Sequence, residues 1–130
     1  MFRSIEILPK RRFEHSASNT AFVQSTAQAI DTGGYNFISL EAWAWNLQTG
    51  DTLDIMIQEA TVNEDDAFVL ALNSPASGTI ISLSGSSGAT RTATAFLPVF
   101  SRFVRLSIGP SLSSGNIVDV RARLNLKQFP

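Results

Sequence analysis

The clearest pattern along the chain is a strict alternation of apolar and polar side chains from Ile117 to Lys127. Apolar residues occupy every second position from Val118 to Leu126, and Asp, Arg, Asn and Lys occupy the positions between them. Successive side chains of a β-strand point to opposite faces, so this pattern predicts a strand with one buried and one exposed or interfacial face.

The same period of two recurs in three other segments. Residues 102–108 and 53–58 alternate in this way, and Phe37–Leu47 is long enough to cross a whole sandwich. These four segments predict a core with the following members: Ile38, Leu40, Leu53, Ile55, Ile57, Val104, Leu106, Ile108, Val118, Val120, Leu124 and Leu126.

Shorter apolar runs lie between turn-forming clusters such as Asp31–Gly34, Thr49–Asp51 and Gly85–Gly88. About eight strands at this spacing are typical of an all-β chain. We therefore expect an antiparallel β-sandwich of the jelly-roll kind, with less than about a tenth of the chain in helix.

Phe37–Leu47 is unusual because both of its faces are apolar. One face carries Ile38, Leu40 and two alanines, while the other carries Trp43 and Trp45. Either the tryptophans fill the core and the alanines lie outside, or the tryptophans meet a partner or a sugar. The pattern favours the core for both tryptophans and leaves the interface open.

The first residues differ in character from the rest of the chain. Pro9 interrupts strand pairing, and Lys10, Arg11 and Arg12 would be costly inside a core. We therefore expect residues 1–14 to form an extended arm outside the sandwich and residues 15–130 to form a single β-sandwich domain.

Charge is distributed unevenly over the 130 residues. Residues 1–12 carry a net charge of +3, residues 13–90 carry −9 and residues 91–130 carry +5. The acidic and basic segments could pair within one sheet or could attract neighbouring copies. Few basic residues and a net charge of −1 argue against a nucleic-acid partner, and no apolar run is long enough for a membrane partner.

The sequence offers no constellation that predicts catalysis. His15 is the single histidine and there is no cysteine, so no cofactor or His/Cys metal site is expected. Asn63–Asp66 is dense in oxygen ligands but lacks the spacing of a calcium loop, and is better explained as a solvated turn. We expect a protein that is not an enzyme.

Several short motifs resemble a set of small structural proteins of tailed bacteriophages. They are the Gly-rich turn at Asp31–Tyr35, GDTLDIMIQEA at residues 50–60, RFVRLSIG at residues 102–109 and the terminal strand at residues 118–127. The chain departs from that pattern at Asn63–Phe68. The resemblance implies a single-domain β-sandwich or jelly roll on a virion, of the head decoration or cement type.

The resemblance and the charge pattern together predict the partners. We expect binding to the major capsid protein and to copies of the chain itself, as a dimer or trimer on the capsid exterior after assembly in the host cytoplasm. The alternatives are a carbohydrate-binding module of a spike or fibre, and a head–tail junction or tail protein. The candidate interface residues are Lys10, Arg11, Arg12, Trp43, Trp45, Arg105, Arg121 and Arg123.

Overall fold

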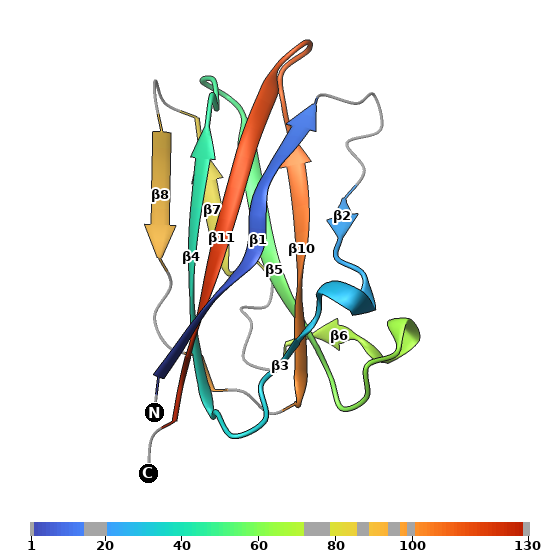
Figure 1. Ribbon diagram of the computed structural model, residues 1–130. Coiled ribbons are helices and arrows are strands. Elements are labelled where there is room, and N and C mark those ends of the chain that lie inside the picture. Colours follow the sequence, from blue (N-terminus) through green and yellow to red (C-terminus); the bar gives the residue numbers. More distant parts are fainter. Residues whose placement is uncertain are drawn as a thin grey trace.

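The computed structural model describes residues 2–14, 21–71, 79–85, 89–93, 97–98 and 101–128, and arranges them as two facing antiparallel sheets (Figure 1). The first sheet has the order β1-β11-β4-β8, with β9 also paired to β4. The second has the order β2-β10-β5-β6, with β3 paired to β10 and β7 to β5. This confirms the predicted antiparallel β-sandwich.

The first sheet contains β1 (Phe2–Glu14), β4 (Phe37–Trp45), β8 (Ala89–Ala93), β9 (Leu97–Pro98) and β11 (Ile117–Lys127). The second contains β2 (Phe22–Val23), β3 (Ile30–Asp31), β5 (Thr52–Ala60), β6 (Val69–Leu70), β7 (Ile81–Ser84) and β10 (Phe103–Ser111). Two single-turn 3-10 helices, η1 (Thr26–Gln28) and η2 (Asp65–Ala67), lie in the connections.

The predicted core is confirmed in full. All twelve predicted side chains are at most 3% exposed, and those from β4 and β11 face those from β5 and β10. Ala42 and Ala44 are also fully buried. Small residues at these positions leave room for the large side chains of the facing sheet, as close packing requires.

The structure corrects the prediction of an arm at residues 1–14. Within the described part of this segment, β1 pairs antiparallel with β11 from Phe2↔Lys127 to Glu14↔Ile117 and forms an edge of the first sheet. Ile7, Leu8 and Phe13 are buried in the core. Residues 2–14 are therefore an integral strand.

Two irregularities in the register explain why this strand escaped sequence analysis. The pairing with β11 shifts between Ile5 and Leu8 and again between Leu8 and Arg11. Such bulges change which face successive side chains occupy, so Ile7 and Leu8 are both buried. Pro9 lies within the second irregularity of an edge strand, where a residue without an N–H is tolerated.

A buried carboxylate joins the two connections that cross between the sheets at one end of the sandwich. Asp51, 1% exposed, follows β4, and its Oδ1 accepts hydrogen bonds from the Ser113 N–H and hydroxyl, both at 2.6 Å. Its Oδ2 accepts from the Gln48 N–H at 3.0 Å and from the Asn116 amide. Burial opposes ionisation of Asp51, but these hydrogen bonds outweigh it and hold its pKa below the ordinary value.

Candidate interaction face

The two tryptophans lie on the outer face of the first sheet. On β4, Ile38, Leu40, Ala42 and Ala44 are buried, whereas Trp43 and Trp45 alternate with them and are partly exposed. The interpretation that placed the tryptophans in the core is therefore wrong, and the smaller residues fill that position. We call the outer surface formed by Lys10, Trp43, Trp45, Arg121 and Arg123 the Trp face.

Cations from β1 and β11 lie over both rings. The Lys10 Nζ is 4.9 Å from the centroid of a Trp45 ring, and the Arg121 Cζ is 5.3 Å from that of Trp43. Arg121 is the cross-strand neighbour of Trp43, which explains how they meet. Contacts of this kind stabilise by about 0.5–1 kcal/mol at exposed sites.

Ion pairs link β1 to β11 beside these rings. Arg121 Nε binds Glu6 Oε1, and Arg12 Nε is 3.3 Å from Asp119 Oδ1. Arg12 is 63% exposed and Arg121 is 34% exposed at the side chain. Exposed pairs contribute about 0–1 kcal/mol each, so they orient the strands more than they stabilise them.

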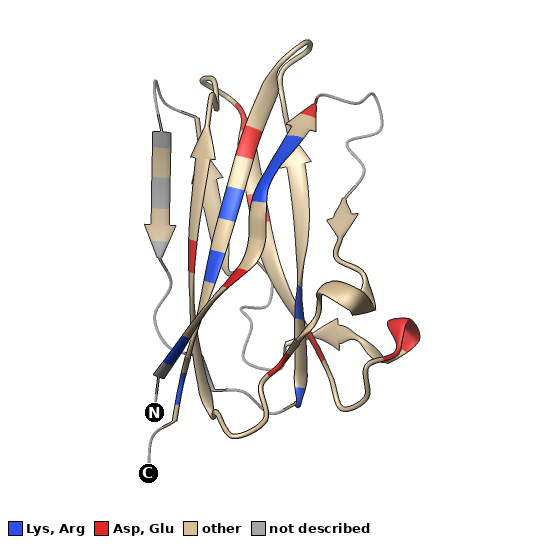
Figure 2. Cartoon of the chain, viewed as in Figure 1, with Lys and Arg blue, Asp and Glu red and all other residues tan. Residues whose placement is uncertain are grey.

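A polar row continues along the same surface. Ser4 Oγ donates to Asn125 Oδ1 at 3.0 Å, and Asn125 Nδ2 donates to Glu41 Oε1 at 3.2 Å. Figure 2 shows Lys and Arg bands on β1 and β11 in this face, with acidic bands between them. The first sheet thus presents an open surface of mixed charge around two aromatic rings.

The structure brings six of the eight predicted interface residues to this surface: Lys10, Arg12, Trp43, Trp45, Arg121 and Arg123. Arg11 differs, because it pairs with Val120 on the inward side and lies at the edge of the sandwich. Its Cζ is 4.0 Å from the Phe22 ring centroid and 5.7 Å from that of Phe13. Arg11 therefore covers an aromatic pair at the side of the core.

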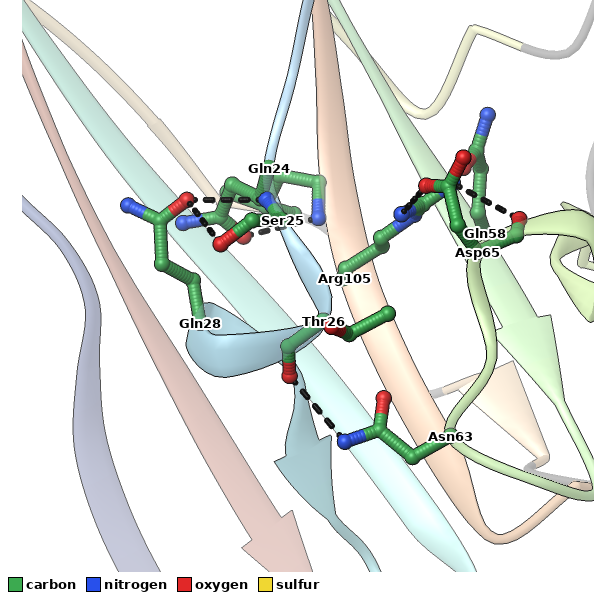
Figure 3. A network of polar contacts seen from close by, with 9 residues as sticks. Gln24, Ser25, Thr26, Gln28, Gln58, Asn63, Asp65 and Arg105 are labelled. Atoms are coloured by element: carbon green, nitrogen blue, oxygen red, sulfur yellow. Dashed lines mark hydrogen bonds and ion pairs between the residues drawn. The ribbon is translucent and has the colours of Figure 1, made fainter.

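Arg105 also departs from the prediction. It points to the outer face of the second sheet, as the alternation requires, yet its side chain is only 5% exposed. It donates to Gln58 Oε1 at 2.8 Å and to Asp65 Oδ1 at 2.7 Å (Figure 3). Its Cζ also lies 4.2 Å from the centroid of the Phe68 ring. Arg105 holds the connection between β5 and β6 in place and is too buried to line an interface.

Gln24 is a structural residue that sequence analysis did not identify. Its side-chain Nε2 donates to the Ile7 carbonyl at 2.7 Å, and its Oε1 accepts from the Leu106 N–H at 2.9 Å. Ile7 belongs to the first sheet and Leu106 to the second, so Gln24 bridges the sheets along one side of the sandwich. No periodic pattern marks such a residue, since it lies outside the regular strands.

The remaining positions considered for metal binding or catalysis are the acidic side chains, the Asn63–Asp66 cluster and His15. Within them, no group of three or more His, Cys, Asp or Glu side chains could hold a metal ion. Sequence analysis explained Asn63–Asp66 as a solvated turn; Asp65 in it is exposed to solvent but also pairs with Arg105. His15 lies outside the described residues. Neither described helix has the length and apolar character needed to cross a membrane.

Comparison with known proteins supports the architecture. No protein-family model matches the chain, and no curated protein matches its sequence. The infectious bursal disease virus VP2 subviral particle superimposes with a TM-score of 0.59 at 11% identity, covering 97% of this chain and 32% of that one. The T13 particle of the same virus gives 0.57 at 11% identity, covering 97% and 30%.

A third similar structure is the PBSX exported protein XepA. It superimposes with a TM-score of 0.55 at 14% identity, covering 98% of this chain and 38% of XepA. The chain thus spans about a third of the length of these similar proteins. Identities this low show a shared sandwich fold, which by itself does not fix function.

Proposed function

We propose that this chain is a non-enzymatic structural protein of a virion, and specifically a capsid decoration or cement protein that binds the major capsid protein lattice. The observation that carries the proposal is the outward, partly exposed Trp face on a sandwich of the kind found in virus particles. The phage-type motifs at residues 50–60 and 102–109 point to the same class.

The Trp face has the composition of a binding surface. Tryptophan and arginine dominate the energetic centres of protein interfaces, because they combine large apolar area with directed polar contacts. Here Trp43, Trp45 and Arg121 lie together on the outer face of one sheet. On a repetitive shell, modest affinity per copy is sufficient when neighbouring copies also touch one another.

The outward position of both tryptophans also favours a second candidate, a carbohydrate-binding role. A sugar stacks on an open aromatic face, but Lys10 lies over Trp45 and Arg121 over Trp43. The ring faces beneath these cations are occupied. The arrangement therefore favours a protein partner, whose carboxylates could engage the same cations.

The experiment compares binding of the purified chain to empty capsid shells and to a glycan array. We expect binding to shells, and we expect the double variant Trp43→Ser/Trp45→Ser to lose it while keeping its sandwich circular dichroism spectrum. The matched control is Val23→Ser, which removes a 42% exposed apolar side chain from β2 and should leave shell binding unchanged. Glycan binding without shell binding would establish the second candidate.

A further inference from the structure

A second exposed surface, of opposite charge, lies on the other sheet. The connection from β5 to β6 carries Glu64, Asp65 and Asp66, and the exposed apolar residues of this region are Val62 (48%), Val69 (59%) and Leu70 (46%). We call the surface formed by Val62, Glu64, Asp66, Val69 and Leu70 the acidic patch.

The acidic patch is held in a defined conformation. Arg105 binds both the carboxylate of Asp65 and, at 3.4 Å, its carbonyl, and the Asn63 side chain donates to the Thr26 carbonyl at 3.0 Å (Figure 3). A surface fixed before binding loses less conformational entropy when a partner arrives. Such fixation suits a recognition surface better than it suits a solvated turn.

The acidic patch and the Trp face are complementary: their charges are opposite, and both carry apolar side chains. Among the described residues, Glu64 and Asp66 form no ion pair. On the Trp face, Glu6 and Asp119 are each paired with an arginine, while Lys10 and Arg123 form no ion pair with a described residue. One surface therefore offers carboxylates beside aliphatic side chains, and the other offers cations beside aromatic rings.

A single copy cannot bring the two surfaces together. The Trp face belongs to the first sheet, and the acidic patch projects from the second, at the side of the sandwich in Figure 2. We propose that the acidic patch of one copy binds the Trp face of the next copy. This inference rests on the self-association that is part of the proposed function. It makes the Trp face the contact between neighbouring copies, so loss of this face would weaken shell binding through the loss of multivalent attachment.

The geometry of such a contact constrains how the copies assemble. A contact between two different surfaces is heterologous, and it generates a closed ring or an open chain. A two-fold dimer would instead have to form the same contact twice, with both surfaces of each copy in one interface. The two surfaces lie on different sheets, so the inference predicts head-to-tail association into a ring or chain rather than a two-fold dimer.

Charge reversal tests the contact in two variants. Glu64→Lys/Asp66→Lys reverses the acidic patch, and Lys10→Glu/Arg123→Glu reverses the cations of the Trp face. In sedimentation velocity at low salt, we expect the wild type to form head-to-tail oligomers and each variant to associate at least about a hundredfold more weakly, because like charges now meet. An equimolar mixture of the variants should associate again, since each reversed surface then finds its complement.

Controls make every outcome decisive. Asp54→Lys reverses a carboxylate elsewhere on the second sheet and should leave the oligomers intact, and circular dichroism shows whether each variant is folded. If a lysine variant unfolds, the neutral Glu64→Gln/Asp66→Asn replaces it and should also weaken association. A monomeric wild type, or a mixture that stays dissociated, overturns the inference. Shell binding by that monomer would still support the proposed function.

Discussion

Arg121 and Arg105 occupy corresponding places on the two sheets, but their surroundings differ. Each points away from the core, lies over an aromatic ring and pairs with a carboxylate. The Arg121 side chain is 34% exposed, whereas that of Arg105 is 5% exposed. The outer face of the first sheet is open, and around Arg105 the outer face of the second is covered by its own connections.

This comparison shows what an alternating pattern predicts and what it omits. Alternation identifies the side chains that leave the core, and it does so correctly for both arginines. It does not show whether another part of the chain covers the outward face. That cover comes here from η2 and Phe68, which have no periodic pattern.

The largest expected effect comes from deleting residues 2–12. The deletion removes Ile7 and Leu8 from the core, at about 1.5–3 kcal/mol each, and exposes the edge of β11. Because a domain has only about 5–15 kcal/mol of stability, we expect the truncated chain not to fold. Circular dichroism measures this, with Lys10→Ser/Arg12→Ser as the control that keeps the strand. A folded truncation would restore the interpretation of this segment as an arm.

The inner faces of the two sheets should lose similar amounts of stability when a core leucine is truncated, although their outer faces differ. Leu106 on β10 and Leu124 on β11 are both fully buried. Truncation of either to Ala should lower the free energy of unfolding by about 2–5 kcal/mol, measured by urea denaturation. A loss below about 0.5 kcal/mol at both sites is the size seen for surface substitutions, and it would mean that the faces are assigned backwards.

The two arginines themselves form the next test. Arg105→Ala should lower the free energy of unfolding by about 1.5–3 kcal/mol, because it removes hydrogen bonds of a buried charged group. Arg121→Ala should lower it by less than about 1 kcal/mol, as expected for an exposed pair. Equal losses in urea denaturation would show that the two outer faces are not different.

A further effect concerns Asp51 and depends on pH. Asp51→Asn should lower the free energy of unfolding by about 1–3 kcal/mol at pH 7, because buried hydrogen bonds lose their charged acceptor. The folded-state pKa of Asp51 lies below the ordinary value of 3.8, so its contribution is present above that value. The contribution is lost as the pH falls through the folded pKa.

The free energies of unfolding of the wild type and the Asp51→Asn variant should therefore converge below about pH 4, as the pH falls through the folded-state pKa of Asp51. Asp31→Asn is the control: its hydrogen bond from Arg102 also lowers its pKa, but the side chain is 46% exposed. Its pH-dependent effect should be much smaller. A constant difference between wild type and Asp51→Asn at every pH would contradict the assignment of Asp51.

The sequence allowed the sandwich and its core to be predicted because regular strands repeat every two residues. It misplaced β1 because two bulges break that repeat, and Pro9 lies in one of them. It misplaced Trp43 and Trp45 because both faces of β4 are apolar, and only packing against the facing sheet selects the alanines. The grouping of Lys10 with Trp45 depends on sheet order, which no local pattern contains.

The most direct test of the proposed function is the location and copy number of this chain in purified virus particles. Quantitative mass spectrometry gives the number of copies relative to the major capsid protein, and electron cryomicroscopy gives their position. The proposal predicts many copies distributed over the outer shell at symmetry positions, with the Trp face in contact with protein. A few copies at one vertex, or none, would contradict it and would favour a tail or carbohydrate-binding role.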